Sequence, residues 1–303
     1  MIADASHHVC YGLAKAFLKP PLARFGFRNP AITQYCSREH LIADRVSTIK
    51  DYETLFSSFA SFRNKVVMEV GCSAGYLLNA FLSKEEFTAI GADINEEALA
   101  SGRQEFGDRI RFVKTTLSEI PVPSNSVDIV YSVDTVEHLT KVRDIVLEVY
   151  RILRPGGLAL IHFCPWSNPY GSHLTEIIPF PWPHVLFSME TLLGVASRIY
   201  DSPDYEAAWY YLDQKTGQKK PNPYRDLDHW NSYLNRMSIR GFNRLIKETP
   251  FEYVHQERIG FGGKTFRIGK LVKMLAQAPL ADEFFCYALY TVLRKPMATQ
   301  GLS

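Results

Sequence analysis

The sequence predicts an α/β fold, in which a mostly parallel sheet carries helices on both faces. Between residues 64 and 163, short β-branched runs alternate with stretches whose apolar residues recur at helical spacing. The chain has 303 residues, of which 46% are hydrophobic and 22% charged, a composition typical of a globular protein with a sizeable core. Strands that alternate with helices pair in parallel, because each return to the sheet needs a crossover.

Five strands are expected in this region, over residues 66–70, 89–93, 110–113, 127–132 and 158–163. Asn95 stands before two glutamates and predicts a helix start, since its side chain caps free amides and the acids favour the positive end of the helix dipole. Another helix is expected from about Leu139 to Ile152, ended by Pro155-Gly156-Gly157. Parallel sheets bind ligands at the carboxyl ends of their strands, so a site is expected there.

Composition divides the chain into four zones. They are a helical N-terminal extension (1–63), the core (64–163), an aromatic lid insertion after the fifth strand (164–233) and a C-terminal part of the core (234–303). The insertion holds all four tryptophans, and Trp and Tyr suit an apolar or sugar-like acceptor. In the last zone a helix is expected around Phe242, followed by strands over 251–254 and 284–293.

Charge and cysteine content exclude several classes of protein. Lys plus Arg is 34 and Asp plus Glu is 32, which gives a net charge of +2 and argues against a nucleic-acid partner. No apolar run reaches membrane-spanning length, and no secretory signal is recognisable. Five scattered cysteines without a CxxC pair favour a reducing compartment, so we expect a cytoplasmic protein with a small-molecule partner. The sequence makes no prediction of the oligomeric state.

A carboxylate and a glycine loop end the first predicted strand. Glu69 lies near its end, and Gly71 and Gly75 lie in the loop. Glycines let the backbone approach a ligand and leave amides at the helix start for a ligand carboxylate. The Glu69 carboxylate would repel a pyrophosphate but suits an ammonium group. The loop therefore predicts an amino-acid ligand rather than a dinucleotide.

A second acid ends the next strand. Asp93 lies 22 positions after Gly71, where a carboxylate accepts both hydroxyls of a ribose. Ile94 follows it and is placed to lie on an adenine ring. An adenosine that carries an amino acid is S-adenosylmethionine. The alternative, that Glu69 and Asp93 are capping or ion-pairing acids, is weaker for the pair at this spacing than for either acid alone.

These motifs together resemble those of the class I S-adenosylmethionine-dependent methyltransferases that act on small molecules. The matching segments are Glu69–Gly75, Gly91–Asp93, Ile120–Pro123 with Ser126–Val130, Val136–His138 and Leu153–Gly157. The resemblance covers about a third of the chain and implies a Rossmann-like sheet of seven strands, the last two forming an antiparallel hairpin at its edge. It implies cofactor contacts at Glu69, Gly71, Cys72, Ser73, Gly75, Asp93, Ile94, Thr116, Leu117, Ser132 and Asp134. Two departures are Ser73, where the family usually has glycine, and Thr116, where it often has Asp.

Histidines are the candidate catalytic bases, since a hydroxyl acceptor is helped by a group that takes its proton near neutral pH. We expect this role at His184, His138 or His173, and interpret His162 as a core residue. His184 gains weight because Pro183–Leu192 resembles an element of the ubiquinone-pathway O-methyltransferases.

A divalent metal is the less favoured use of the segment after the fourth strand. Asp134, Glu137 and His138 have the spacing of one helical face, and His173 or His184 would complete a ligand shell. Some O-methyltransferases carry a similar E-x-x-E-H. The favoured interpretation is that the two acids line the cofactor mouth or cap a helix, so no metal is expected.

Two acid-free stretches leave another alternative open. Ala5–Arg38 and Arg258–Ala281 contain basic residues but no acids, a pattern that suits either anionic lipid or a solvated basic surface, and we favour the latter. The function expected is methyl transfer to a small-molecule acceptor, most simply a hydroxyl. The alternatives are an amine or lipid acceptor at a membrane surface, and a non-catalytic cofactor-binding module.

Overall fold

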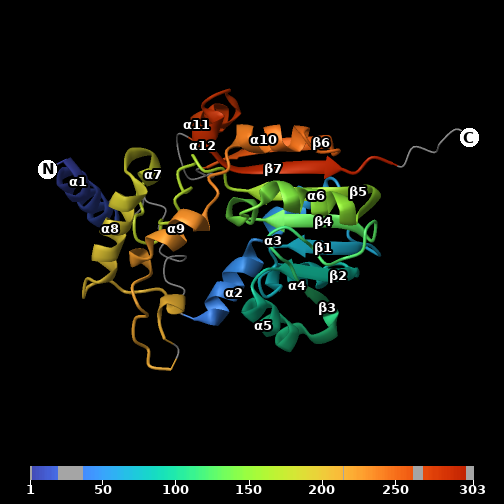
Figure 1. Ribbon diagram of the computed structural model, residues 1–303, viewed down its shortest axis with the longest axis horizontal. Coiled ribbons are helices and arrows are strands. Elements are labelled where there is room, and N and C mark those ends of the chain that lie inside the picture. Colours follow the sequence, from blue (N-terminus) through green and yellow to red (C-terminus); the bar gives the residue numbers. More distant parts are fainter. Residues whose placement is uncertain (1, 20–36, 214, 262–268, 298–303) are drawn as a thin grey trace, which may run out of the picture.

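The fold is built on one seven-stranded sheet, whose strands lie side by side across Figure 1. The computed structural model describes residues 2–19, 37–213, 215–261 and 269–297. The strand order is β3-β2-β1-β4-β5-β7-β6. The strands are β1 (Val66–Val70), β2 (Thr88–Asp93), β3 (Ile110–Lys114), β4 (Val127–Val133), β5 (Leu153–Phe163), β6 (Glu252–Gly260) and β7 (Cys286–Arg294). β1 to β5 pair in parallel and β7 is antiparallel to both β5 and β6, so the predicted fold class and edge hairpin are confirmed.

Strand β5 begins earlier than the sequence predicts. Val127 pairs with Leu153 and Ile129 with Leu158, so residues 154–157 form an irregular segment inside the strand instead of a helix end. A Cβ on Gly157 would lie 2.9 Å from the carbonyl oxygen of Asp128, so only glycine allows the two strands to run this close.

Helices cover both faces of the sheet. They include α2 (Arg38–Ser47), α3 (Ile49–Ser57), α4 (Tyr76–Leu82), α5 (Glu96–Phe106), α6 (Val142–Ile152) and α10 (Ile239–Lys247). α6 and α10 pack on one face and α3, α4 and α5 on the other, each with its own apolar cluster. Asn95 caps α5 as predicted, because its side chain accepts hydrogen bonds from the amides of Glu97 and Ala98.

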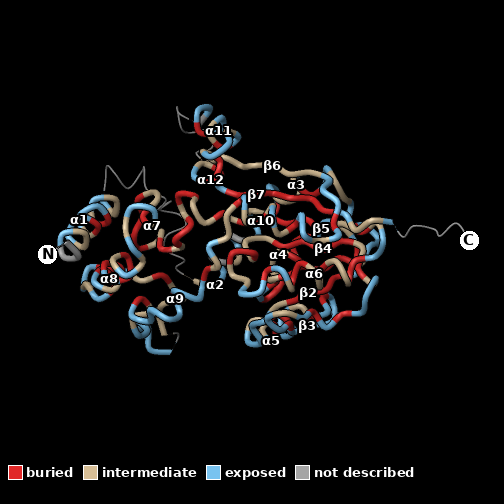
Figure 2. The backbone as a smooth tube through the Cα atoms, turned by 45° about the horizontal axis from the view of Figure 1, so that its top comes forward, coloured by how far each residue is buried: buried red, intermediate tan, exposed pale blue. Residues whose placement is uncertain are grey.

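The aromatic insertion has a core of its own, and the first helix belongs to it. It contains α7 (Pro183–Leu186), α8 (Met189–Tyr200), the short 3₁₀ turns η4 (Trp209–Tyr211) and η5 (Pro223–Arg225), and α9 (Leu227–Tyr233). α1 (Ile2–Phe17) packs against α8 and buries Cys10 and Ala14 completely. Figures 1 and 2 show this group beside the sheet, at the end opposite the C-terminus. The predicted N-terminal extension therefore does not act as one unit. α1 packs on the insertion, whereas α2 and α3 pack beside α4 on the sheet.

A further pair of helices lies between the last two strands. α11 (Gly269–Gln277) and α12 (Asp282–Phe285) follow β6 and lead into β7. β7 starts beside the carboxyl end of β5, with Leu289 paired to Phe163, so this pair lies at the edge where the predicted site residues gather. In the described residues, we find no helix with the length and apolar character that crossing a bilayer demands.

Candidate functional site

The two predicted acids end neighbouring strands at the carboxyl edge of the sheet. Glu69 pairs with Gly91 of β2 on one side and with Tyr131 of β4 on the other. Its side chain is buried, with 4% of the residue exposed. Burial and the nearby Glu69 carboxylate raise the pKa of the Tyr131 hydroxyl, so the tyrosine stays neutral beside the acid. A buried carboxylate of this kind calls for a cationic partner.

The glycine loop needs its glycines for conformation and for space. Gly71 and Gly75 have φ values of 82° and 81°, which side-chain-bearing residues rarely adopt. A Cβ on Gly71 would lie 2.1 Å from Oγ1 of Thr135, so the loop after β1 packs directly on the turn after β4. Ser73 also has a positive φ, 51°, which gives a physical reason for the glycine that resembling proteins usually carry there.

The backbone amides of this loop are used differently from the expectation. Gly71 and Cys72 donate to the carbonyl oxygen of Ala92 at 2.8 and 3.1 Å, and Ser73 donates to Oδ2 of Asp93 at 2.7 Å. These three amides therefore tie the loop to the end of β2, and they are not free for a ligand carboxylate. The pairing of β1 with β2 simply continues into the loop.

Asp93 is held in place by the backbone. Its Oδ2 accepts from Ser73 and its Oδ1 accepts from the amide of Asn95 at 2.8 Å. Each oxygen keeps a second lone pair, so the carboxylate fits two ribose hydroxyls. Ile94 and Leu117, which follow β2 and β3, are 51% and 49% exposed, and their position beside Asp93 suits the two sides of a flat ring.

Thr116 is engaged in its own turn. Its Oγ1 accepts from the amides of Ser118 and Glu119 at 3.3 and 3.0 Å, and its amide donates to the Glu119 carbonyl oxygen. Thr116 thus stabilises the turn that exposes Leu117. Its amide and its Oγ1 are already hydrogen-bonded within that turn.

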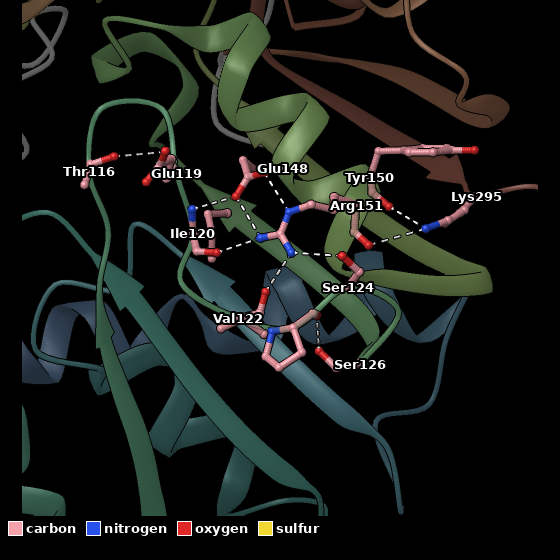
Figure 3. A network of polar contacts seen from close by, with 11 residues as sticks. Thr116, Glu119, Ile120, Val122, Ser124, Ser126, Glu148, Tyr150, Arg151 and Lys295 are labelled. Carbon is pink, nitrogen blue, oxygen red and sulfur yellow. Dashed lines mark hydrogen bonds and ion pairs between the residues drawn. The ribbon is translucent and has the colours of Figure 1, made fainter.

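A guanidinium clamp, which the sequence analysis missed, fixes the segment that follows this turn (Figure 3). Arg151 of α6 donates to the carbonyl oxygens of Ile120 and Val122 at 2.8 and 2.9 Å and pairs with Glu148. Glu148 in turn accepts from the amide of Ile120 at 2.9 Å. Three main-chain groups of one loop are satisfied by two side chains of one helix, which immobilises the loop. In the sequence, the i,i+3 spacing of Glu148 and Arg151 indicates an ion pair on one helix face, and this pattern could have revealed the clamp.

Ser132 lies at the carboxyl end of β4, and its hydroxyl faces the interior. It lines a small apolar cavity of about 20 Å³ between the sheet and α6, together with Val70 and Ile145. Its buried hydroxyl makes no hydrogen bond to any residue in the described ranges. A cofactor contact at Ser132 would therefore be made by its backbone, which stays at the edge of the sheet.

The three candidate histidines lie in one neighbourhood. The rings of His138 and His173 are 5.0 Å apart, and charge on His138 or His184 would lower the pKa of His173. His138 contacts the carbonyl oxygen of Tyr233 through Nδ1 at 3.2 Å, and His184 contacts that of Trp166 through Nε2 at 2.7 Å. Burial lowers the pKa of His138, and it lowers those of His173 and His184 to about 4. All three are neutral at pH 7.

The less favoured metal triad of Asp134, Glu137 and His138 does not form with the spacing of one helical face. Ligand atoms of Glu137, His138 and His173 lie within 4.8 Å of one another, and so do those of Asp134, Glu137 and Cys164. Asp134 and His138 therefore belong to different groups that share Glu137. The segment is a single 3₁₀ turn, η3 (Val136–His138), preceded by Asp134 with φ 48°, so an α-helical spacing does not apply.

Glu137 and His162 have environments that the sequence did not reveal. Glu137 is 4% exposed, and burial together with the charge of Asp134 raises its pKa to about 8. It is protonated at neutral pH. Nδ1 of His162 lies 3.1 Å from Oδ1 of Asp134, so His162 is a buried residue of β5 with a polar partner, in agreement with its interpretation as a core residue.

Comparison with known proteins agrees with this geometry. Residues 68–161 match the profile of a family described as a methyltransferase domain. Together with the strand order, this match supports a class I methyltransferase domain over these residues. S-adenosylmethionine, the cofactor expected from the sequence, is the methyl donor of this class.

Two curated relatives show how far the likeness extends. An uncharacterized methyltransferase of Mycobacterium ulcerans is 28% identical over 153 residues, which are 50% of this chain and 58% of that protein. A protein of Mycolicibacterium smegmatis named "Probable S-adenosylmethionine-dependent methyltransferase" is 35% identical over 145 residues, 43% of this chain and 54% of that protein. The chain thus spans little more than half the length of the curated relatives it matches.

The fold has a counterpart among solved structures. A crystal structure of a S-adenosylmethionine dependent methyltransferase from Mesorhizobium loti superposes with a TM-score of 0.50 at 15% identity, over 82% of this chain and 99% of that chain. This likeness concerns the fold of the methyltransferase domain.

Proposed function

We propose that the protein transfers a methyl group from S-adenosylmethionine to a hydroxyl of a small-molecule acceptor, with a histidine as general base. One observation carries the proposal. The buried acid Glu69 and the backbone-held acid Asp93 flank a glycine loop, and the turn that packs on this loop leads directly to neutral His138. Nucleoside-binding acids and proton acceptors thus share one edge of the sheet.

Each residue has a definite task in this proposal. Glu69 receives the ammonium group of the cofactor's amino-acid part, and Asp93 accepts from its ribose hydroxyls. Ile94 and Leu117 lie against the two faces of the adenine. When bound, the cofactor supplies the electrophilic methyl group, and the protein supplies orientation and exclusion of water.

His138 is the base that we favour. A carbonyl oxygen only accepts, so Nδ1 of His138 carries the hydrogen toward Tyr233, and Nε2 keeps a lone pair. Because burial keeps the ring neutral, this lone pair is free to take the proton of an acceptor hydroxyl. The contact of Thr135 with the Gly71 position places the His138 turn beside the cofactor loop.

His184 is the alternative base. Its Nε2 donates to the Trp166 carbonyl oxygen, which leaves the lone pair on Nδ1, and this buried atom accepts no hydrogen bond from the described part of the chain. His184 lies in the aromatic insertion, whose Tyr170 meets Tyr287 at a ring distance of 5.3 Å. The insertion therefore contacts the start of β7, beside the carboxyl edge of the sheet.

The test compares cofactor binding with turnover. Formation of S-adenosylhomocysteine is measured against a panel of phenols, aliphatic alcohols and amines, and cofactor affinity is measured by calorimetry. We expect His138→Ala to keep the affinity and lose turnover about 100-fold or more, while exposed His8→Ala changes neither. Full turnover in each of His138→Ala, His173→Ala and His184→Ala would refute a histidine base. Cofactor binding without turnover on any acceptor would instead indicate a non-catalytic module.

A metal-assisted reaction is the second candidate, because Glu137, His138 and His173 hold their ligand atoms within 4.8 Å of one another. A carboxylate and two imidazoles suit Zn²⁺, Mn²⁺ or Fe²⁺. Metal content by mass spectrometry and melting with added Mn²⁺ or Zn²⁺ test this. Metal that remains bound in the wild type and is lost in Glu137→Gln would favour it. Unchanged turnover after complete removal of metal would dismiss it.

A further inference from the structure

The α11–α12 segment exposes large apolar side chains. Leu271, Met274 and Leu280 are 54%, 68% and 70% exposed, while Val272 and Ala276 on the opposite side of α11 are buried against the sheet edge. Figure 2 shows α11 projecting beyond β6 and β7. Single exposed apolar residues are ordinary, but three within ten residues of one projecting segment call for a partner.

The charges around these side chains are of one sign. Lys270 and Lys273 are exposed on α11, and Lys270 lies one turn before Met274 on the same face of the helix. The stretch from Arg258 to Ala281 contains no acid. The next two residues are acidic but buried: Asp282 pairs with Arg258 at 3.1 Å, and Glu283 accepts the amides that open α10.

The same apolar character continues onto the aromatic insertion. Nε1 of Trp182 donates to the carbonyl oxygen of Phe284 at 3.0 Å, which joins the start of α7 to α12. On α7, Val185 and Leu186 are 49% and 63% exposed. The exposed acids closest along the chain are Glu190 on α8 and Glu257 on β6, and neither belongs to α7 or α11.

We propose that this α7–α11 surface, made of Val185, Leu186, Lys270, Leu271, Lys273, Met274 and Leu280, docks on an anionic phospholipid bilayer. Apolar side chains beside lysines fit a bilayer surface, because the apolar groups enter the acyl boundary while the ammonium groups meet lipid phosphates. α11 projects from the edge of the sheet, which suits contact with a fluid surface. Docking would turn the carboxyl edge of the sheet, and the site there, toward the membrane. This inference goes beyond the proposed function and is independent of the acceptor.

The test is sedimentation with vesicles. Wild-type protein is mixed with vesicles of phosphatidylcholine alone or with 30 mol% phosphatidylserine as an estimate of an anionic leaflet, at about 50 and 500 mM salt. We expect binding only to the anionic vesicles, weakened by salt. Lys270→Glu with Lys273→Glu is expected to lower the partition coefficient at least about tenfold, and Leu271→Ser with Met274→Ser by a similar factor.

Matched controls lie at the opposite edge of the sheet. Lys65→Glu with Lys247→Glu changes the same charge, and Val254→Ser with Met297→Ser removes comparable exposed apolar surface. Both control pairs are expected to sediment like the wild type. The proposal is overturned if the wild type ignores anionic vesicles, or if the controls lose as much binding. It is also overturned if Leu271→Ser with Met274→Ser abolishes a dimer seen by light scattering, since a second copy would then be the partner. None of these readouts depends on methyl transfer.

Discussion

Glu69 and Asp93, which we propose bind two parts of the cofactor, are held in different ways. Glu69 is enclosed within a strand, where water cannot screen it, whereas Asp93 is oriented by the amides of Ser73 and Asn95. The sequence showed both acids because their spacing from the glycines is local. The sequence did not show that the loop amides of residues 71–73 donate to Ala92 and Asp93 instead of to a ligand. Those hydrogen bonds depend on how β1 and β2 continue to pair beyond the sheet.

The two acids are expected to dominate cofactor affinity. Glu69→Gln removes the charge opposite the ligand ammonium while keeping the shape, and Asp93→Ala removes the acceptor of the ribose hydroxyls. Each is expected to weaken S-adenosylhomocysteine binding at least about tenfold, because hydrogen bonds to charged groups contribute roughly 1.5 to 3 kcal/mol. Calorimetry measures this, with exposed Asp108→Ala as the control. Wild-type affinity in both variants would contradict the site.

The elements differ in how much of them the sequence could predict. β1 to β4 and α5 follow from β-branched runs and a capping Asn, signals that lie within a few residues. The pairing of α1 with α8 could not be predicted, because the side chains that bury Cys10 and Ala14 come from residues about 180 positions later. The three-histidine neighbourhood shows both cases. The sequence predicted each of the three histidines as a separate candidate. Their proximity depends on the fold, which places η3 beside the insertion.

The loop between β1 and α4 allows two effects of replacing a glycine to be separated. One is the steric clash of the added Cβ, and the other is the strain of a positive φ. Gly71→Ala places a methyl group 2.1 Å from Oγ1 of Thr135, whereas Gly217→Ala has a similar φ of 70° with no atom within 4 Å. Both pay about 1–2 kcal/mol for the left-handed conformation, and only the first also displaces the β4 turn. We expect a greater loss of unfolding free energy and of cofactor affinity in Gly71→Ala. Equal losses in denaturant titrations would show that the contact does not matter.

The association of α1 with the insertion is testable with a matched pair of alanines. Ala14 is fully buried against α8, while Ala16 is exposed on the same helix. Ala14→Glu is expected to detach α1, since an unpaired buried carboxylate costs several kcal/mol. Hydrogen exchange would then rise in α1 and α8 but stay unchanged in β1 to β4. Ala16→Glu serves as the control, and faster exchange in the sheet would mean that the two cores are one cooperative unit.

At the scale of the whole molecule, buried titratable groups at the carboxyl edge couple stability to pH with opposite signs. His173 and His184 have pKa values near 4, below their usual 6.5, so stability falls as pH drops from 6.5 toward 4. Glu137 has a pKa near 8, above its usual 4.5, so it remains protonated in the folded chain while the unfolded chain has already lost its proton. The contribution of Glu137 is therefore lost as pH rises toward 8.

The comparison of wild type with Glu137→Gln between pH 6.5 and 8 isolates Glu137, because the histidines contribute equally to both proteins and their contributions cancel. Glu137→Gln keeps the shape without a titratable proton. The unfolding free energy of the wild type relative to this variant is expected to fall by up to about 1.4 kcal/mol per pH unit in this window, the slope for one proton. Exposed Glu252→Gln should follow the wild type. Parallel slopes for wild type and Glu137→Gln in urea titrations at pH 6.5, 7.2 and 8.0 would mean that Glu137 is ionised in the folded protein, with a cation or water beside it.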